Sequence, residues 1–135
     1  MATTVAQNPW SEILHHEKEQ ILELRWLPST RMTDGAFKAT LALFAWEAEK
    51  SRPAFLLVDA LHFRHEPGEG VNRWRDDHIM PRYGAAGTQK FAMIVPEGVP
   101  DTVESGSKPE PEGEAVFLTA WFSSREHALR WFREG

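Results

Sequence analysis

Two continuous apolar runs of strand length, AFLLVD at residues 54–59 and KFAMIV at 90–95, constrain the fold more than any other feature. Runs of this kind are typical of central strands that are buried on both faces. The stretch between them, GVNRWRDDHIMPRYG at 70–84, has a helical pattern, and Pro81 is expected to kink or end that helix. A strand, a helix and a second strand in this order predict a right-handed parallel crossover.

A hairpin is predicted before the first of these runs. The segments 10–16 and 20–27 are joined by the short polar turn EKE. In the second segment, Leu22, Leu24 and Trp26 alternate with the charged residues Glu23 and Arg25. This alternation predicts an antiparallel pair of strands with one apolar face.

A helix is predicted over residues 35–50, with Thr33 as its N-cap. Phe37, Leu41 and Phe44 follow at helical spacing, and Ala48 extends the same apolar stripe. On a helical wheel with 100° per residue, Trp46 lies roughly 180° from this stripe. We therefore expect Trp46 to be exposed or to contact something outside the helix's own core face.

The C-terminal part completes the element order β-β-α-β-α-β-β-α. Residues 115–122 predict a last strand, and residues 123–134 predict a closing helix capped by Ser123 or Ser124. The fold class is therefore α/β, with a mixed five-stranded sheet. We expect a loose tail at residues 1–9, one domain at 10–135 and a loop rich in proline and glutamate at 97–113.

Composition and charge exclude several classes of function. The chain has no cysteine, which excludes disulfides, thiolate metal sites and cysteine nucleophiles. The net charge of −5 disfavours nucleic acid and anionic membranes as partners. A local cluster of Arg73, Arg75 and Arg82 encloses Asp76 and Asp77, so we interpret it as a solvated face of mixed charge.

Location and assembly are predicted from the same composition. No apolar run approaches the roughly 20 residues of a membrane span, and the first residues lack the pattern of a signal peptide. We therefore expect a cytoplasmic protein without an integral membrane segment. Six tryptophans are many for 135 residues, and tryptophan is enriched at protein interfaces. We predict a homodimer with Trp46 at its interface.

The loop that follows the first apolar run holds the candidate chemistry. Asp59, His62, His65 and Glu66 are residue types that bind zinc, nickel or iron, so a metal-dependent enzyme is one alternative. The His-x-x-His spacing on a loop lacks the i, i+4 arrangement of helical metal sites. The competing interpretation is a polar loop in which Asp59 caps the next helix or accepts a backbone hydrogen bond. We predict no catalytic residues, no metal and no cofactor.

Binding at this edge of the sheet is the preferred hypothesis. In open α/β sheets, ligands bind beyond the carboxyl ends of the parallel strands. The residues expected to contact a protein partner or a small ligand there are Asp59, His62, Arg64, His65, Arg73 and Trp74.

Several stretches resemble a known family. They are ILHHEKEQILELRWL, DGAFKATLALFAWEAEK, FLLVDA, MPRYGAAGTQKFAMIVPE and VFLTAWFSSREHALRWF, and they cover most of residues 12–133. Together with the element order, they resemble the STAS-like fold of bacterial anti-sigma-factor antagonists, in particular SpoIIAA-like and STAS/SEC14-type proteins. The resemblance implies a non-enzymatic regulatory or binding domain.

One departure from that family concerns its phosphorylation switch. The classical antagonists carry a phosphorylated serine or threonine after the central strand, but this chain has neither between Asp59 and Thr88. The SEC14-type side of the resemblance implies a second alternative, a protein that binds a small molecule or a lipid. That alternative predicts an apolar cavity beside the last helix, near Trp121, Trp131 and Phe132.

Overall fold

Four parallel strands form the centre of the sheet, and the two apolar runs are two of them. A computed structural model of the chain describes residues 2–28, 32–63, 65, 68–96, 110–111 and 117–134. Each central strand pairs in parallel with the next. In their order across the sheet they are β3 (Ile21–Trp26), β4 (Phe55–Asp59), β5 (Lys90–Ile94) and β7 (Leu118–Phe122).

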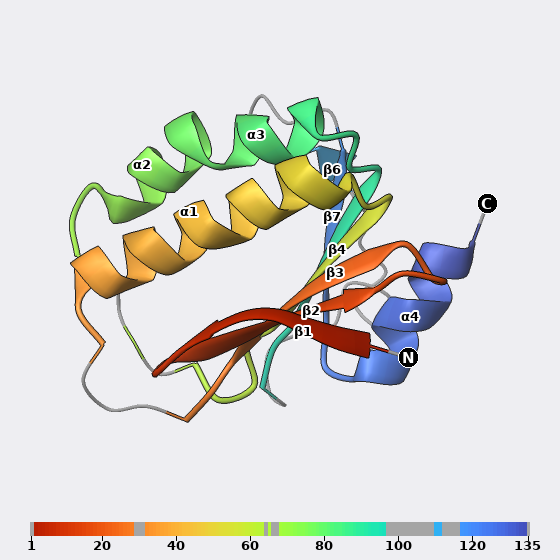
Figure 1. Cartoon of the computed structure of the whole chain (residues 1–135), viewed down its shortest axis with the longest axis horizontal. Coiled ribbons are helices and arrows are strands. Elements are labelled where there is room, and N and C mark those ends of the chain that lie inside the picture. Colours follow the sequence, from red (N-terminus) through yellow and green to blue (C-terminus); the bar gives the residue numbers. More distant parts are fainter. Residues whose placement is uncertain are drawn as a thin grey trace.

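The first hairpin is also present, with β2 (Ser11–His16) antiparallel to β3. The sheet is larger than the five strands expected, because β1 (Ala2–Asn8) and the two-residue strand β6 (Glu110–Pro111) join its edges. The seven strands are arranged as β1-β2-β3-β4-β5-β7-β6. The described part of the chain thus has a mixed α/β fold (Figure 1).

Strand β1 occupies the place where a loose tail was expected. It pairs antiparallel with β2. The side-chain oxygen of Asn8 accepts hydrogen bonds from the Trp10 backbone nitrogen at 2.9 Å and the Ser11 hydroxyl at 3.1 Å, which closes a tight turn between the strands. The β-branched residues Thr3 and Thr4 favour extended backbone. Local turn chemistry therefore orders a segment that looked like a terminus.

Four helices complete the described fold: α1 (Asp34–Ser51), α2 (Val71–His78), α3 (Met80–Ala85) and α4 (Arg125–Arg133). The predicted N-caps of α1 and α4 are confirmed, because Thr33 accepts from the Ala36 nitrogen at 3.0 Å and Ser124 accepts from the His127 nitrogen at 3.2 Å. The single helix expected at 70–84 is two helices that meet at Ile79. Pro81 stands in the first turn of α3, where a missing backbone N–H is tolerated.

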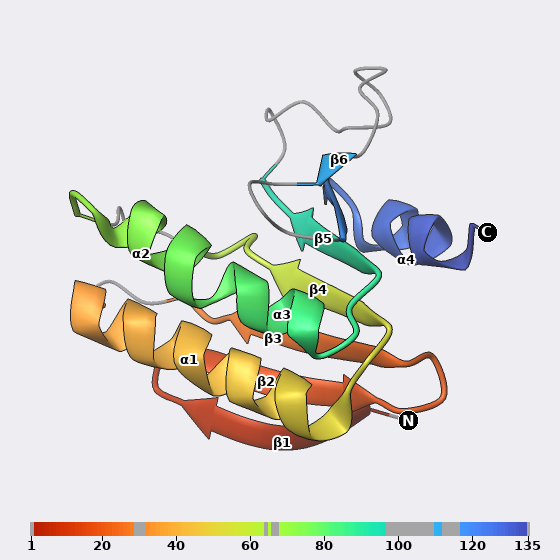
Figure 2. The same cartoon turned by 90° about the horizontal axis from the view of Figure 1, so that it is seen from above.

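The helices form two layers of unequal size. Helices α1, α2 and α3 cover one face of the sheet, and α4 packs on the opposite face (Figures 1 and 2). Trp26 and Phe44 belong to the core under α1–α3, whereas Leu57 and Phe122 belong to the core under α4. None of the helices that the structure describes is long and apolar enough to cross a lipid bilayer.

Candidate functional site

A pocket of about 320 Å³ lies between the sheet and helices α1–α3. One end of it is near the carboxyl ends of the parallel strands, since Trp26 is the last residue of β3 and Ala60 follows β4. The pocket extends from there to Phe91 and Thr119, the second residues of β5 and β7. Most of its lining side chains are apolar. The lining residues are Trp26, Phe37, Leu41, Val58, Ala60, Phe63, Asn72, Arg75, Met80, Tyr83, Phe91, Met93, Thr119 and Trp121.

Strand register sets the floor of this pocket. Val58 on β4 is opposite Met93 on β5, which in turn is opposite Trp121 on β7. Side chains at matched positions of neighbouring strands point to the same face of a sheet. These three residues therefore form one row across the strands, facing α1–α3.

Aromatic rings form two walls. Trp26 stacks on Phe37 with ring centroids 5.6 Å apart, and Phe63 contacts Trp26 at 4.9 Å. Phe63 comes from the loop after β4, so this contact anchors part of that loop to the core. On the other side Tyr83 stacks on Phe91 at 5.8 Å. Burial raises the pKa of Tyr83 above its usual range, so its phenol is neutral at ordinary pH.

Three polar side chains interrupt the apolar lining. Asn72 and Arg75 come from α2, and Thr119 is the second residue of β7. The guanidinium of Arg75 donates to the Asp76 carboxylate at 3.1 and 3.3 Å. Apolar walls with a few convergent polar groups are typical of small-molecule sites.

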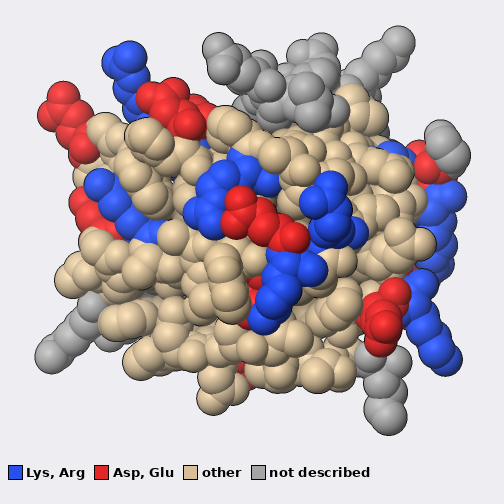
Figure 3. Space-filling view, turned by 45° about the horizontal axis from the view of Figure 1, so that its top comes forward, with Lys and Arg blue, Asp and Glu red and all other residues tan. Residues whose placement is uncertain are grey.

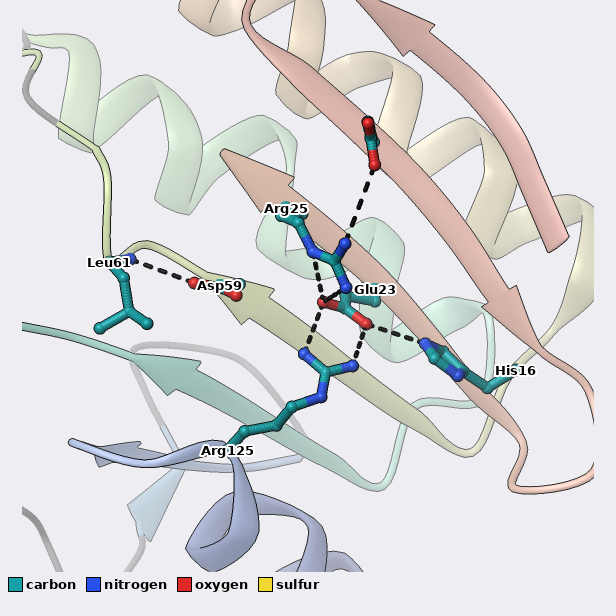
Figure 4. A network of polar contacts seen from close by, with 7 residues as sticks. His16, Glu23, Arg25, Asp59, Leu61 and Arg125 are labelled. Atoms are coloured by element: carbon teal, nitrogen blue, oxygen red, sulfur yellow. Dashed lines mark hydrogen bonds and ion pairs between the residues drawn. The ribbon is translucent and has the colours of Figure 1, made fainter. Parts of the chain in front are cut away.

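The predicted contact residues of the loop are divided between the two faces of the sheet. The Asp59 carboxylate accepts a hydrogen bond from the Leu61 backbone nitrogen at 3.2 Å and lies on the α4 face (Figure 4). This is the backbone role that the competing interpretation foresaw. His62 is exposed. Arg64 and Glu66 lie outside the described residues.

His65 connects the loop to α1. Its Nε2 lies 2.7 Å from Oδ1 of Asp34, the first residue of that helix, and the Gly68 backbone nitrogen donates to the same carboxylate at 3.2 Å. The hydrogen bond to His65, and then that from Gly68, lower the pKa of Asp34. Among the described residues, no three histidine, aspartate or glutamate side chains are placed to hold a metal ion. Asp59 lies on the α4 face and His65 bonds to α1, so these two side chains are not brought together.

Arg73 and Trp74 do not line the pocket. The Arg73 side chain is 88% exposed and lies 3.7 Å from the Asp77 carboxylate, so it faces solvent. Trp74 packs beside the core with Lys38 Nζ 5.3 Å from its ring centre. Their neighbours Asn72 and Arg75 line the pocket in their place. The sequence does indicate the position of Arg75: it lies four positions after the buried Val71, which places both residues on the same face of the helix.

The arginine cluster has the mixed character that its sequence indicates. Besides the Arg73 and Arg75 pairs, Arg82 donates to both oxygens of Glu49 on α1, at 3.1 and 2.5 Å. Basic and acidic side chains are interspersed over the side of the molecule that carries α1–α3, as Figure 3 shows.

Trp46 is exposed, as its position on the helical wheel predicts, with 52% of its surface accessible. Lys50 Nζ lies 4.3 Å from the centre of its ring. A role for Trp46 at a dimer interface stays a prediction.

A buried carboxylate, that of Glu23, lies on the α4 face of the sheet. The pattern of charges in the sequence does not predict its burial. Glu23 is fully buried and receives both arms of the Arg125 guanidinium from α4, Nη1 at 2.8 Å and Nη2 in a shorter contact (Figure 4). His16 Nε2 at 2.8 Å and the Arg25 guanidinium at 3.3 Å complete the cluster. Burial raises the pKa of Glu23, but the bonds and charges of these partners outweigh that effect and lower it overall.

A second hollow, about 400 Å³ in volume, lies beside this cluster. It is lined by His16, Glu19, Ile21, Phe55, Arg125, Leu129, Phe132 and Arg133. The apolar cavity expected beside the last helix is thus not found as described. Phe132 lines this partly charged hollow, Trp121 lines the pocket on the opposite face, and the buried Trp131 lines neither.

Two features are therefore candidates for a functional site: an apolar pocket between the central strands and α1–α3, and a separate charged cluster under α4. The resemblance to STAS-like proteins stays a prediction, because no family model, no curated protein and no solved structure matches this chain.

Proposed function

We propose that this chain is a non-enzymatic binding domain that holds a small apolar molecule in the pocket between β4, β5, β7 and helices α1–α3. The pocket itself is the observation that carries the proposal. One end of it is at the carboxyl ends of β3 and β4, the edge where open α/β sheets bind their ligands. Its volume of about 320 Å³ falls in the range of small-molecule sites, roughly 300–1,000 Å³.

The alternative of a metal-dependent enzyme has less support. It requires Asp59, His62, His65 and Glu66 to converge, whereas Asp59 and His65 bond to groups on opposite sides of the sheet. A protein partner at the same sheet edge is compatible with the exposed ring of Trp121, 38% accessible at the pocket lining. The apolar and aromatic lining of the pocket favours a small ligand over a protein surface.

Filling the pocket tests the proposal. The neutral dye N-phenylnaphthylamine is expected to bind with a rise in its fluorescence, because the pocket shields it from water. In Ala60→Phe, the added ring is expected to occupy the pocket and weaken binding by at least about tenfold, by excluding the dye from apolar surface. Dye titration and thermal unfolding are measured on the same samples.

Ala39→Phe is the matched control, since Ala39 is exposed on α1 and does not line the pocket. It is expected to bind the dye like the wild type. A wild type that binds no dye, or an Ala60→Phe protein that is folded and binds it unchanged, would contradict the proposal.

We also propose that the protein is a homodimer that buries Trp46. An exposed tryptophan of this size is a frequent binding hot spot, worth about 2 kcal/mol or more. Trp46→Ser is therefore expected to raise the dimer dissociation constant about 30-fold or more, whereas Trp46→Phe retains much of the contact. Light scattering during size-exclusion chromatography over a concentration series measures the change. A wild type that is monomeric at micromolar concentration would refute the dimer.

A further inference from the structure

Thr119 lines the floor of the pocket, and its hydroxyl has no hydrogen-bond partner among the residues that the structure describes. Its side chain lines the pocket, and only 3% of the residue's surface is exposed. Within the described part of the chain, no donor or acceptor reaches its Oγ1. A buried hydroxyl in this state has lost its hydrogen bonds to water without gaining others, so it is poised to receive one from a ligand.

The position of Thr119 places this hydroxyl among aromatic rings. Thr119 is opposite Phe91 in the parallel register of β5 and β7, and Phe91 stacks on Tyr83. Trp121, two residues further along the same strand, lies on the same face. A molecule bonded to Thr119 would thus lie against ring faces and edges, which favour aromatic partners in offset or edge-to-face contact.

The pocket volume limits the size of that molecule. An apolar cavity of about 150 Å³ accommodates one benzene ring. The present pocket, at about 320 Å³, is roughly twice as large and therefore suits two fused or linked rings.

We infer that the pocket takes a two-ring aromatic molecule carrying one hydrogen-bonding group, and that this group bonds to Thr119 Oγ1. The inference rests on the proposed function and specifies its ligand class. Thr119 is the residue that distinguishes such a ligand from a purely apolar one, because a site built to bond a polar group discriminates against the analogue that lacks it.

A second buried threonine provides a matched control. Thr88 is 5% exposed, and its Oγ1 likewise has no partner in the described part of the chain. It follows α3 and precedes β5, and it does not line the pocket. Thr88→Val therefore makes the same chemical change at similar burial, outside the lining of the pocket.

The experiment uses naphthol and naphthalene as probes, measured by tryptophan fluorescence and calorimetry. The wild type is expected to bind naphthol more tightly than naphthalene. Thr119→Val is expected to weaken naphthol binding about tenfold and to leave naphthalene binding unchanged. Thr88→Val is expected to change neither. Thermal unfolding of Thr119→Val is expected to be unimpaired, since valine removes an unpaired hydroxyl and keeps the shape.

The outcomes separate the two proposals. Naphthalene binding without any preference for naphthol, or a preference that survives in Thr119→Val, overturns the role of Thr119 and leaves the apolar pocket standing. Equal loss of both probes in Thr119→Val assigns the residue a packing role and also overturns the inference. A wild type that binds neither probe overturns both proposals.

Discussion

Arg125→Met is expected to lower the free energy of unfolding by about 3–5 kcal/mol at neutral pH. Glu23 is fully buried, and Arg125 supplies two of its hydrogen bonds from α4. Methionine retains apolar bulk but leaves the carboxylate with only Arg25 and His16. Urea unfolding followed by circular dichroism measures the loss. Because α4 holds this arginine, we also expect faster hydrogen exchange in α4.

Two further variants separate charge from packing. Glu23→Met combined with Arg125→Met removes both charges, and we expect it to be more stable than Arg125→Met alone, since no buried charge remains unpaired. Arg82→Met breaks the Glu49 pair, which has similar two-armed geometry on the surface, and is expected to cost about 0–1 kcal/mol. Equal losses in Arg82→Met and Arg125→Met would show that burial of Glu23 is not decisive.

The pH dependence of this cluster follows from the lowered pKa of Glu23. A carboxyl whose folded-state pKa lies below its unfolded value stabilises the protein above the unfolded value, about 4.3, and that stability is lost as pH falls through the folded value. Without Arg125, burial remains and the pKa of Glu23 should rise. The deficit of Arg125→Met is therefore expected to be largest near pH 7 and to shrink toward acid pH. A deficit that is constant from pH 7 to acid would contradict this account.

Periodicity predicts the core of this fold because it records which side of an element is buried. Phe37, Leu41 and Phe44 form the buried stripe of α1 as expected, and Trp46 on the opposite side is exposed. The parallel order of β4 and β5 follows in the same way from two apolar runs separated by a helical segment.

The candidate site was only partly predictable, because it depends on how elements pack. The alternation in β3 places Glu23 and Trp26 on opposite faces of the sheet. Burial of the Glu23 carboxylate, however, depends on α4, which covers the second face and provides Arg125, 102 positions away. Binding at the carboxyl ends of the strands was the expectation, and one end of the pocket lies there. The lining of the pocket was not predicted, because Thr119 has the pattern of an ordinary strand residue and its place in the pocket depends on the pairing of β5 with β7.

Trp26→Ala is the second large expected effect, a loss of about 3–5 kcal/mol in the free energy of unfolding. Trp26 is 3% exposed and contacts Phe37 and Phe63. Its removal leaves a cavity beside an existing pocket and takes away the ring that holds Phe63. Urea unfolding measures the loss, and near-ultraviolet circular dichroism reports the lost packing.

Trp46→Ala is the matched control, because it removes the same side chain from an exposed position on α1. Measured at low protein concentration, where any dimer is dissociated, it is expected to change stability by no more than about 0.5 kcal/mol. Trp26→Phe keeps a ring in the cluster and should lie between the two. Since Trp26 also forms a wall of the pocket, Trp26→Ala is expected to weaken binding of N-phenylnaphthylamine even where the protein remains folded. Equal stability of Trp26→Ala and Trp46→Ala would mean that the aromatic cluster under α1 does not hold the loop after β4 in place.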